Sequence, residues 1–330
     1  MRARCVRFLA PYRVALEQVD VPEPREGQLL VRAESSGLSG GTEMLAFRGE
    51  LDPGLPRDES LGALGGTFAY PFSYGYSVVG RVERSRGSIP SGALVFAFHP
   101  HQDLFVVEEG DAVVLDGADP RQATLLPLVE TGLQVALDAE PRLGAHLIVQ
   151  GLGCVGILTA YLLARSGARV LGSEPDPARR RAAAQLGVEA VSPADLAECV
   201  AEATSGRGSD LVVEASGSPD ALREALPLLA HEGTALVCSW YGTKPVSLPL
   251  GAEFHRRRLT IRSSQVSTIP ARLAGQWDRG RRREAALALL KEIPLETLTT
   301  HEFPFDAAGE AYAAIARQEP GLIHATLRYP

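Results

Sequence analysis

The spacing of apolar residues changes character about a third of the way along the chain, and this change divides the chain into two parts. Before residue 123, short apolar runs are separated by Gly, Pro and Asp, a pattern typical of β-strands in an irregular barrel or sandwich. The runs lie at residues 5–19, 28–37, 77–85, 93–98 and 104–110. A Gly- and Pro-rich segment at 49–71 lies between them, and a loop of this length is more often functional than idle.

The second part alternates between apolar strands and helices. Residues 122–139 have helical spacing, and strands are then predicted at 146–150, 168–174, 209–216, 234–240 and 259–266. Helices are predicted between them, at 155–167, 176–187, 193–206 and 219–230. This βαβ alternation predicts a doubly wound parallel sheet. Two further helices and a final apolar strand at 321–329 are expected to belong to the domain formed by the first part of the chain, because the parallel sheet of the second part already looks complete.

The pattern therefore predicts an α/β protein of two domains. A β-barrel domain is expected at residues 1–125 and 268–330, and a dinucleotide-binding domain with a doubly wound parallel sheet at 126–267. The length of 330 residues agrees with two domains of ordinary size.

The strongest local signal is a glycine motif between the strand at 146–150 and the helix that follows it. Gly151, Gly153 and Gly156 form G-x-G-x-x-G, with Cys154 and Val155 in the variable positions. The first glycine permits a tight turn, the second lets the backbone approach a pyrophosphate, and the third lets helix and strand pack closely. The helix N-terminus then supplies amide donors and the positive end of the helix dipole.

The next strand ends at Glu174, close to the position where a dinucleotide site carries its ribose-binding acid. A carboxylate there accepts hydrogen bonds from the ribose and repels a 2′-phosphate, so NAD(H) is favoured over NADP(H). Asp176 competes for this role but better fits the N-cap of the following helix. Arg179 and its neighbours leave NADP(H) open as the alternative.

Further cofactor contacts are expected at the carboxyl ends of the later strands, where ligands bind to open sheets. Ser216 and Gly217 are expected on the adenine side. Candidate walls of the nicotinamide pocket are Trp240, Tyr241, Ser264 and Gln265.

Composition narrows the class of partner. The net charge of −7 favours solubility and argues against nucleic acid or an anionic membrane surface as a partner. A small-molecule substrate is expected. No apolar run approaches the ~20 residues that a membrane span needs. The N-terminus lacks the continuous apolar stretch of a signal peptide, so a cytoplasmic location is expected. The four cysteines include no C-x-x-C pair.

The chain resembles the medium-chain dehydrogenase/reductase superfamily along its whole length. The resemblance rests on QLLVRAESSGLSGGTE, SYGYSVVGRVERS, ALVFAF and GLGCVG. It implies a chaperonin-like (GroES-like) barrel, a Rossmann nucleotide domain and a return to the barrel. SGLSGGTEMLAFRGE, SWYG and RRLTIRSSQ further resemble a zinc-binding alcohol dehydrogenase-like branch that includes bacteriochlorophyllide 3-hydroxyethyl dehydrogenases. Members of this size are often homodimers, which we expect here.

The resemblance also shows where the zinc ligands of this superfamily are missing. Ser39 stands at the first, cysteine position, and Tyr76 followed by Ser77 replaces His-Glu. Pro127 stands at the third, and Glu130 fits only if the register slips. Hydroxyl and phenol are poor zinc ligands at neutral pH. No metal site is therefore expected.

Three side-chain groups are candidates to replace the zinc as a proton donor or oxyanion partner. Tyr76 lies where a metal ligand would point into the cleft. Thr42 occupies the proton-relay position if one residue is inserted at Gly40-Gly41. His101, with His99 on the same loop, offers an imidazole for proton transfer, or a different metal site.

Five aromatic residues alternate through the segment that contains Tyr76. In an extended segment their rings would share one face and could form the wall of a pocket for a large or flat substrate. The alternative is a loop sealed onto the core. The five are Phe68, Tyr70, Phe72, Tyr74 and Tyr76.

Together these features predict a zinc-independent NAD(H)-dependent oxidoreductase that interconverts a secondary alcohol and a ketone on a fairly large or aromatic substrate. Two alternatives stay open. One is an enone or quinone reductase of the zinc-less type, and the other is a non-catalytic NAD(H)-binding sensor.

Overall fold

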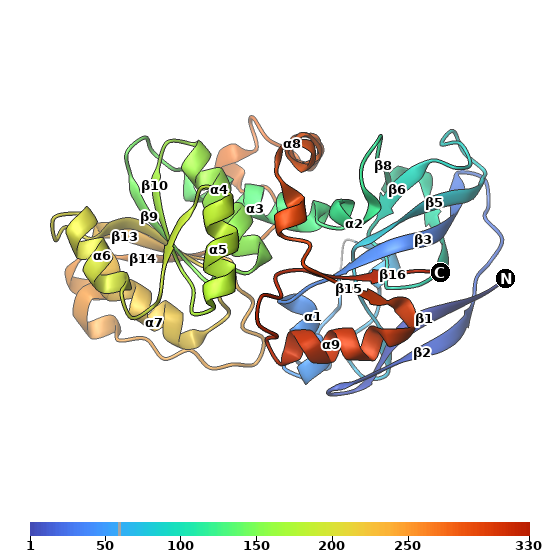
Figure 1. The fold of residues 1–330 in the computed structure, drawn as a ribbon, viewed down its shortest axis with the longest axis horizontal. Coiled ribbons are helices and arrows are strands. Elements are labelled where there is room, and N and C mark those ends of the chain that lie inside the picture. The colour runs from blue at the N-terminus through green and yellow to red at the C-terminus, as the bar shows by residue number, and fades with distance from the viewer. Residues whose placement is uncertain (59–60) are drawn as a thin grey trace. The chain divides into compact units, whose positions relative to one another are not determined.

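The chain folds into two compact units in the computed structural model, which describes residues 1–58 and 61–330 (Figure 1). The first unit comprises Met1–Pro127 and Thr299–Pro330, and the second comprises Leu128–Leu298. The first is built on mainly antiparallel sheets and the second on a parallel sheet flanked by helices. This confirms the α/β class and the combination of a barrel with a Rossmann sheet.

The first unit contains two sheets. An N-terminal hairpin and one short strand form the smaller sheet, in the order β2-β1-β4. The larger has the order β15-β16-β3-β5-β6-β8, with β7 also paired to β3. The strands are β1 (Arg2–Ala10), β2 (Arg13–Asp20), β3 (Gln28–Leu38), β4 (Phe72–Ser73), β5 (Val78–Ser85), β6 (Leu94–Ala97), β7 (Leu104–Glu108), β8 (Ala112–Val114), β15 (His301–Pro304) and β16 (Ala325–Arg328).

The C-terminal strand belongs to the first unit because it completes that sheet. Strand β16 pairs antiparallel with β3, with Ala325 opposite Leu38 and Arg328 opposite Ser35. The helices of the first unit are α1 (Thr42–Arg48), α2 (Pro120–Ala123) and α9 (Ala308–Ala316). Helix α3 (Leu126–Ala139) begins at the end of this unit and continues into the second.

The aromatic segment contributes to the core of the first unit. Phe68, Phe72 and Tyr74 are at most 4% exposed, and the Phe72 ring stacks on Phe8 at 5.2 Å between centroids. Phe68 contacts both Phe72 and Tyr74 edge to face. For these three rings the alternative of a loop sealed onto the core is confirmed and the pocket wall is wrong, because their apolar area is buried inside the first unit.

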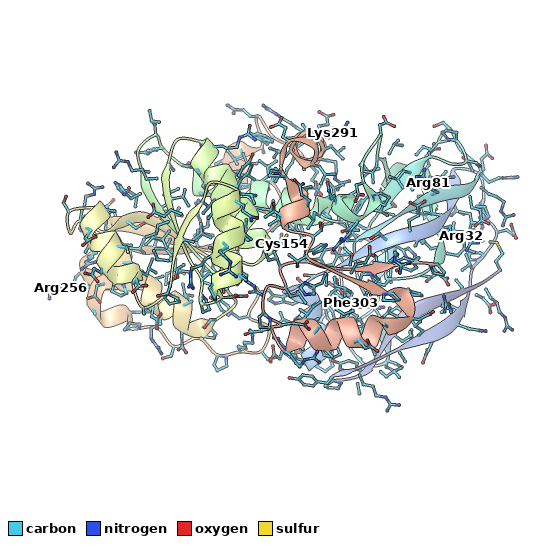
Figure 2. All side chains as sticks on the ribbon, in the orientation of Figure 1. Arg32, Arg81, Cys154, Arg256, Lys291 and Phe303 are labelled. Atoms are coloured by element: carbon cyan, nitrogen blue, oxygen red, sulfur yellow. The ribbon has the colours of Figure 1, made fainter. Side chains whose placement is uncertain are left out.

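The outer face of the barrel carries alternating charged residues, as the two-residue period of a strand requires. Arg32 on β3 pairs with Glu83 at 3.0 Å, and Arg81 on β5 pairs with Glu34 at 2.7 Å. Figure 2 shows Arg32 and Arg81 on this part of the chain. Exposed pairs of this kind contribute little to stability, so the face is mainly a solvated surface.

The second unit is a six-stranded parallel sheet in the order β11-β10-β9-β12-β13-β14. Counted from β9, this is the 3-2-1-4-5-6 order of the Rossmann fold. The strands are β9 (His146–Gln150), β10 (Arg169–Ser173), β11 (Glu189–Val191), β12 (Ser209–Glu214), β13 (Leu229–Val237) and β14 (Thr260–Ser263). The helices are α4 (Cys154–Arg165), α5 (Pro177–Gln185), α6 (Leu196–Ala203), α7 (Pro219–Leu228) and α8 (Arg279–Glu292).

The boundary between the units differs from the expected one, because residues 268–298 belong to the second unit and not to the barrel. The reason is visible in α8. Arg282 donates to Gln134 at 2.7 Å, and Arg283 donates to Glu130 at 2.9 Å. Both acceptors lie on α3, so these contacts tie α8 to the parallel-sheet unit.

A buried histidine makes the stability of the first unit depend on pH. Burial lowers the pKa of His324 to about 3, and its Nε2 lies 3.1 Å from the Thr124 hydroxyl oxygen. The imidazole of His324 takes up a proton below about pH 6.5 in the unfolded chain, but only below about pH 3 in the folded chain. This contribution to stability is therefore complete above pH 6.5 and falls by at most ~1.4 kcal/mol per pH unit below it. Urea unfolding at pH 7, 6 and 5 measures this slope.

A His324→Asn variant provides the comparison for that measurement. It cannot take up the proton, so its free energy of unfolding should fall less steeply between pH 7 and pH 5 than that of the parent chain. Equal slopes in the two proteins would show that His324 does not stay neutral in the folded state.

Candidate functional site

The glycine motif forms the turn between β9 and α4. Gly151 has φ +87°, and a Cβ there would lie 2.5 Å from the Cα of Ser216. A Cβ on Gly156 would lie 1.9 Å from the Gly151 carbonyl oxygen. Contacts within the protein thus explain both glycines. They bring the carboxyl ends of β9 and β12 together, at the point where the strand order reverses.

Gly153 is different, because nothing among the described residues explains it. It is the N-cap of α4, and no atom of those residues, apart from its chain neighbours, lies within 4 Å of a Cβ placed there. A side chain would therefore meet open space above the helix N-terminus. Close approach of an anionic ligand to this backbone is the physical reason for a glycine at such a position. The residues present thus fit the pyrophosphate of a dinucleotide.

The two residues between these glycines have packing roles. Cys154 begins α4, where Figure 2 labels it, and it is buried. Burial raises the pKa of its thiol to about 12. The thiol therefore stays protonated at neutral pH and is a poor nucleophile. Val155 is partly buried on the same turn, so the ligand-facing part of the motif is its backbone.

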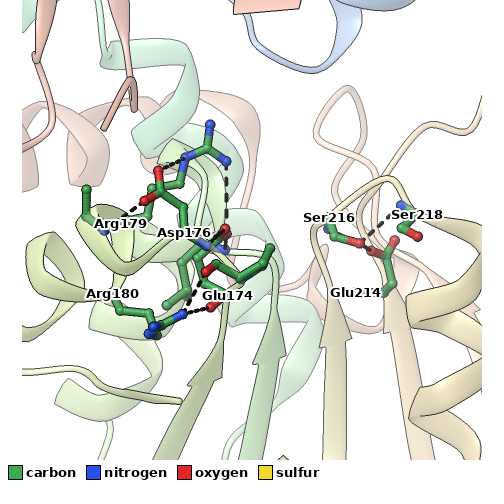
Figure 3. A network of polar contacts seen from close by, with 10 residues as sticks. Glu174, Asp176, Arg179, Arg180, Glu214, Ser216 and Ser218 are labelled. Atoms are coloured by element: carbon green, nitrogen blue, oxygen red, sulfur yellow. Dashed lines mark hydrogen bonds and ion pairs between the residues drawn. The ribbon is translucent and has the colours of Figure 1, made fainter. Parts of the chain in front are cut away.

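Glu174 follows β10, and Figure 3 shows it beside Asp176 and Arg180. It is 3% exposed. One carboxylate oxygen accepts from the Leu152 N–H at 2.8 Å and the other accepts from the Asp176 N–H at 3.0 Å. The backbone thus fixes the orientation of the carboxylate, and each oxygen keeps acceptor capacity for a further donor. Asp176 accepts from the Ala178 N–H at 2.8 Å, which confirms it as the N-cap of α5.

Glu214, at the end of β12, is a residue that the sequence analysis missed. It is fully buried, and its Oε1 accepts from the Ser216 N–H at 2.6 Å, the Ser216 hydroxyl at 2.5 Å and the Gly217 N–H at 3.1 Å. Figure 3 shows this carboxylate beneath the turn that carries Ser216 and Ser218. An acid two residues before Ser-Gly at a strand end was the signal that could have identified it.

Glu214 also holds Tyr241, one of the residues expected to line the nicotinamide pocket. The Tyr241 hydroxyl donates to Glu214 Oε2 at 2.7 Å, and burial and the carboxylate raise the pKa of this phenol. The Tyr241 hydroxyl is thus engaged within the sheet unit and does not point to a ligand. The place of Tyr241 as a candidate wall of the nicotinamide pocket stays a prediction, with its ring and not its hydroxyl as the contact.

The remaining strand-end candidates differ in their surroundings. Ser264 is buried, and its hydroxyl donates to Asp138 at 2.7 Å. Gln265 is exposed and hydrogen bonds with Ser267 in its own turn. Trp240 is 42% exposed. The Ser264 hydroxyl is engaged inside the unit, whereas Trp240 and Gln265 offer exposed surface at the carboxyl ends of the strands.

In the first unit, the pairing of β3 with β5 brings the Ser39 and Tyr76 segments together. The Gly37 N–H donates to the Ser77 carbonyl at 3.0 Å, two residues before Ser39 and one after Tyr76. Ser39 is buried, Tyr76 is half-buried, and Thr42 is the first residue of α1. The candidates Tyr76 and Thr42 therefore lie on neighbouring segments of one unit.

The two histidines of the loop before β7 are not equivalent. His101 is fully buried, with Nε2 at 3.0 Å from Glu43 and Nδ1 at 2.9 Å from Ser36. The interpretation of His101 as a proton shuttle to water is therefore wrong, because both ring nitrogens have buried protein partners. His99 stacks on Phe105 at 4.1 Å between centroids, and burial lowers its pKa to about 4.

The positions that the resemblance assigns to zinc ligands do not form a metal-binding set. Throughout residues 1–58 and 61–330, no group of three or more His, Cys, Asp or Glu side chains is arranged to hold a metal ion. Glu130 is buried and accepts from Arg283 at 2.9 Å. Ser39, Tyr76 and Pro127 lack the donor atoms that zinc prefers. The residues present do not fit a zinc ion.

A Rossmann sheet with an open glycine turn, joined in one chain to a barrel, is an architecture typical of nicotinamide-dependent dehydrogenases. Comparison with known proteins agrees with this class. Residues 154–279 match the family model of zinc-binding dehydrogenases. D-guloside 3-dehydrogenase of Escherichia coli (strain K12) is 25% identical over 335 residues, covering 94% of this chain and 95% of that protein.

Two further relatives extend the comparison. The 2-desacetyl-2-hydroxyethyl bacteriochlorophyllide A dehydrogenase of Rhodobacter capsulatus is 27% identical over 330 residues, covering 94% of both chains. The crystal structure of 2R,3R-butanediol dehydrogenase from Bacillus subtilis has a TM-score of 0.80 at 20% identity and covers 99% of both chains. Together these similarities support assignment of the chain to the medium-chain dehydrogenase/reductase superfamily. Within the described residues, no helix is both long and apolar enough to cross a membrane.

Proposed function

We propose that this chain is a zinc-independent NAD(H)-dependent oxidoreductase that interconverts a secondary alcohol and a ketone on a fairly large or aromatic substrate. The observation that carries the proposal is the open backbone at Gly153, beside two glycines that the protein's own packing explains. It supports close approach of a dinucleotide pyrophosphate to the N-terminus of α4. When bound, the nicotinamide supplies the hydride chemistry, and the protein supplies orientation and electrostatics.

Glu174 supports NAD(H) over NADP(H). Its carboxylate is held at the edge of the glycine turn by the Leu152 and Asp176 amides. A fixed, buried carboxylate accepts hydrogen bonds from a ribose and disfavours a 2′-phosphate. Arg179 Nη1 lies 4.0 Å from Glu174, so its charge is directed toward this acid.

Because Ser39, Tyr76 and Pro127 do not fit a metal ion, hydrogen-bond donors of the first unit have to stabilise the oxyanion that develops on the substrate. Tyr76 is the principal candidate, because a phenol ordinarily keeps its proton at neutral pH and can donate it. Thr42 lies on the neighbouring segment and can relay a proton. Within the second unit, Trp240 is exposed at a strand end and supports an apolar wall of the nicotinamide pocket. The dehydrogenases of a D-guloside and of a hydroxyethyl bacteriochlorophyllide are consistent with a large alcohol.

One experiment tests the reaction and the metal together. Untagged protein, purified without added zinc or chelator, should contain less than about a tenth of an equivalent of metal by mass spectrometry. The same protein should reduce bulky aryl ketones with NADH, should use NADPH less well, and should oxidise the product alcohol with NAD. About one equivalent of tightly held zinc, with activity lost on chelation, would contradict zinc independence.

The other outcomes distinguish the alternatives. Reduction of enones or quinones that does not reverse would favour the double-bond reductase. Tight NADH binding without turnover of any of these substrates would favour the non-catalytic sensor. The homodimer and the cytoplasmic location stay predictions.

A further inference from the structure

A buried hydrogen-bonded cluster, which we call the Glu43 hub, lies inside the first unit. Its members come from segments far apart in the sequence, and each contacts at least one other member. Glu43 and His101 are fully buried, and Ser36 and Tyr312 are also 0% exposed. The hub consists of Ser36, Ser39, Glu43, His101, Tyr312 and Tyr329.

Glu43 is the acceptor at the centre of the hub. Its Oε1 accepts from the Ser39 N–H at 2.9 Å. Its Oε2 accepts from His101 Nε2 at 3.0 Å and from the Tyr312 hydroxyl at 2.5 Å. Burial and the Glu43 charge raise the pKa of Tyr312, which keeps that phenol protonated as a donor. The carboxylate is thus satisfied by three protein donors.

His101 is held at both ring nitrogens. A carboxylate can only accept, so Nε2 carries the proton that points to Glu43. Nδ1 contacts the Ser36 hydroxyl at 2.9 Å, and that hydroxyl contacts the Tyr329 hydroxyl at 3.0 Å. The imidazole therefore has a single orientation, set from two opposite sides.

The hub contacts both segments that carry the candidate donors. Glu43 follows Thr42 in α1 and closes the turn back to Ser39. On the other side, Gly75 has φ +116°, and a Cβ there would lie 2.5 Å from the His101 ring. Gly75 immediately precedes Tyr76, so the His101 ring packs directly against the backbone that places this phenol.

Buried charged groups are a poor way to gain stability, because a well-packed apolar cluster is often at least as stable. Such groups can instead specify one conformation. In this unit, the hub contacts both the 39–43 turn and the 75–76 backbone, so it can specify their relative position.

We propose that Glu43 and His101 are positioning residues that fix Tyr76 relative to Thr42 for oxyanion stabilisation and proton relay. The proposal rests on the proposed function of Tyr76. In this proposal His101 does not transfer a proton itself. It positions Tyr76, the side chain that donates the proton. Misplacement of a reacting group by about 1 Å can lower a rate by about 10²-fold, and this sets the expected effect.

The first test measures the position of Tyr76 without any substrate. A fluorotyrosine is placed at position 76, and its ¹⁹F NMR spectrum is recorded in the parent chain, in His101→Gln and in Gly75→Ala. The parent should give one narrow resonance. Both variants should give a shifted, broadened or doubled resonance, because one removes the ring and the other displaces it. His301→Gln, a half-buried histidine outside the hub, is the matched control and should leave the spectrum unchanged.

The second test measures turnover. His101→Gln should lower kcat for ketone reduction by about 10²-fold, with KM within about threefold and the NADH dissociation constant unchanged. NADH binding shows that the second unit is folded, and Tyr312→Phe, which removes a single donor, should give an intermediate kcat. An unchanged ¹⁹F spectrum and kcat in His101→Gln would overturn the proposal and leave the hub as core packing. Absence of ketone turnover by the parent chain would instead contradict the proposed function, and the ¹⁹F result would still decide the hub.

Discussion

Tyr76→Phe is expected to lower kcat for ketone reduction by about 10²–10³-fold, the usual effect of removing one donor to a developing oxyanion. The substitution removes a hydroxyl and keeps the ring, which contacts Tyr74 at 6.4 Å between centroids. Packing in the first unit should therefore change little. The glycine turn lies in the other unit, so the NADH dissociation constant should stay within about twofold of the parent value. Steady-state kinetics and a fluorescence titration with NADH measure the two quantities.

Two control variants make this result specific. Tyr12→Phe removes a phenol that is 63% exposed and should leave kcat unchanged. Tyr70→Phe removes a hydroxyl that donates to the Ala46 carbonyl in the same aromatic segment, and should lower stability without a comparable loss of kcat. If Tyr76→Phe turns over at the parent rate, Tyr76 takes no part in the mechanism. Thr42→Val would then be the next variant to measure.

Gly153→Val is expected to abolish detectable NADH binding while the protein stays folded. The Gly153 backbone is extended, with φ −69° and ψ −176°, and the space around its Cβ is open. A valine side chain is therefore accommodated by the protein and occupies the space where we place the pyrophosphate. We expect at least a ~10²-fold loss of affinity, because the ligand must give up its contacts with the helix N-terminus. A fluorescence titration with NADH tests the loss of affinity, and thermal unfolding tests whether the protein stays folded.

Gly151→Ala is the matched variant in the same turn. It should act mainly on stability, whereas Gly153→Val should act mainly on NADH affinity. Gly151 has φ +87°, and an added Cβ would lie 2.5 Å from Ser216 Cα. The β9–β12 contact has to shift, so Gly151→Ala should lower the unfolding temperature clearly, whereas Gly153→Val should change it little. Retained NADH affinity in a folded Gly153→Val protein would contradict our placement of the dinucleotide.

The sequence indicated the site in the second unit more completely than the site in the first. A glycine turn, the strand before it and the helix after it are contiguous in the chain, so local spacing identifies Gly151, Gly153 and Gly156. Glu174 follows from the length of one βα unit. Glu214 was missed, because an acid two residues before Ser-Gly at a strand end is only a weak signal until the turn that it binds is seen.

The candidate donors of the first unit depend on contacts between distant segments. His101 and Glu43 are separated by 58 residues, and Tyr312 and Glu43 by 269. No local pattern indicates that these side chains share one buried cluster. His101 was therefore interpreted as a loop histidine open to water. For the same reason the aromatic series left a pocket wall and a loop sealed onto the core both open, since an alternating pattern does not distinguish a core face from a ligand face.

The sequence by itself determined most of the strand and helix alternation of the second unit, the glycine turn for a dinucleotide and the absence of the usual zinc ligand types at Ser39, Tyr76 and Pro127. These features depend on residue type and short-range spacing, because turns and periodic faces form between near neighbours. Only the tertiary structure decided which polar groups are buried together and where the units divide. Burial and hydrogen bonding join residues that are far apart in the chain, so the roles of Glu43, His101 and Glu214 appear only when the chain is folded.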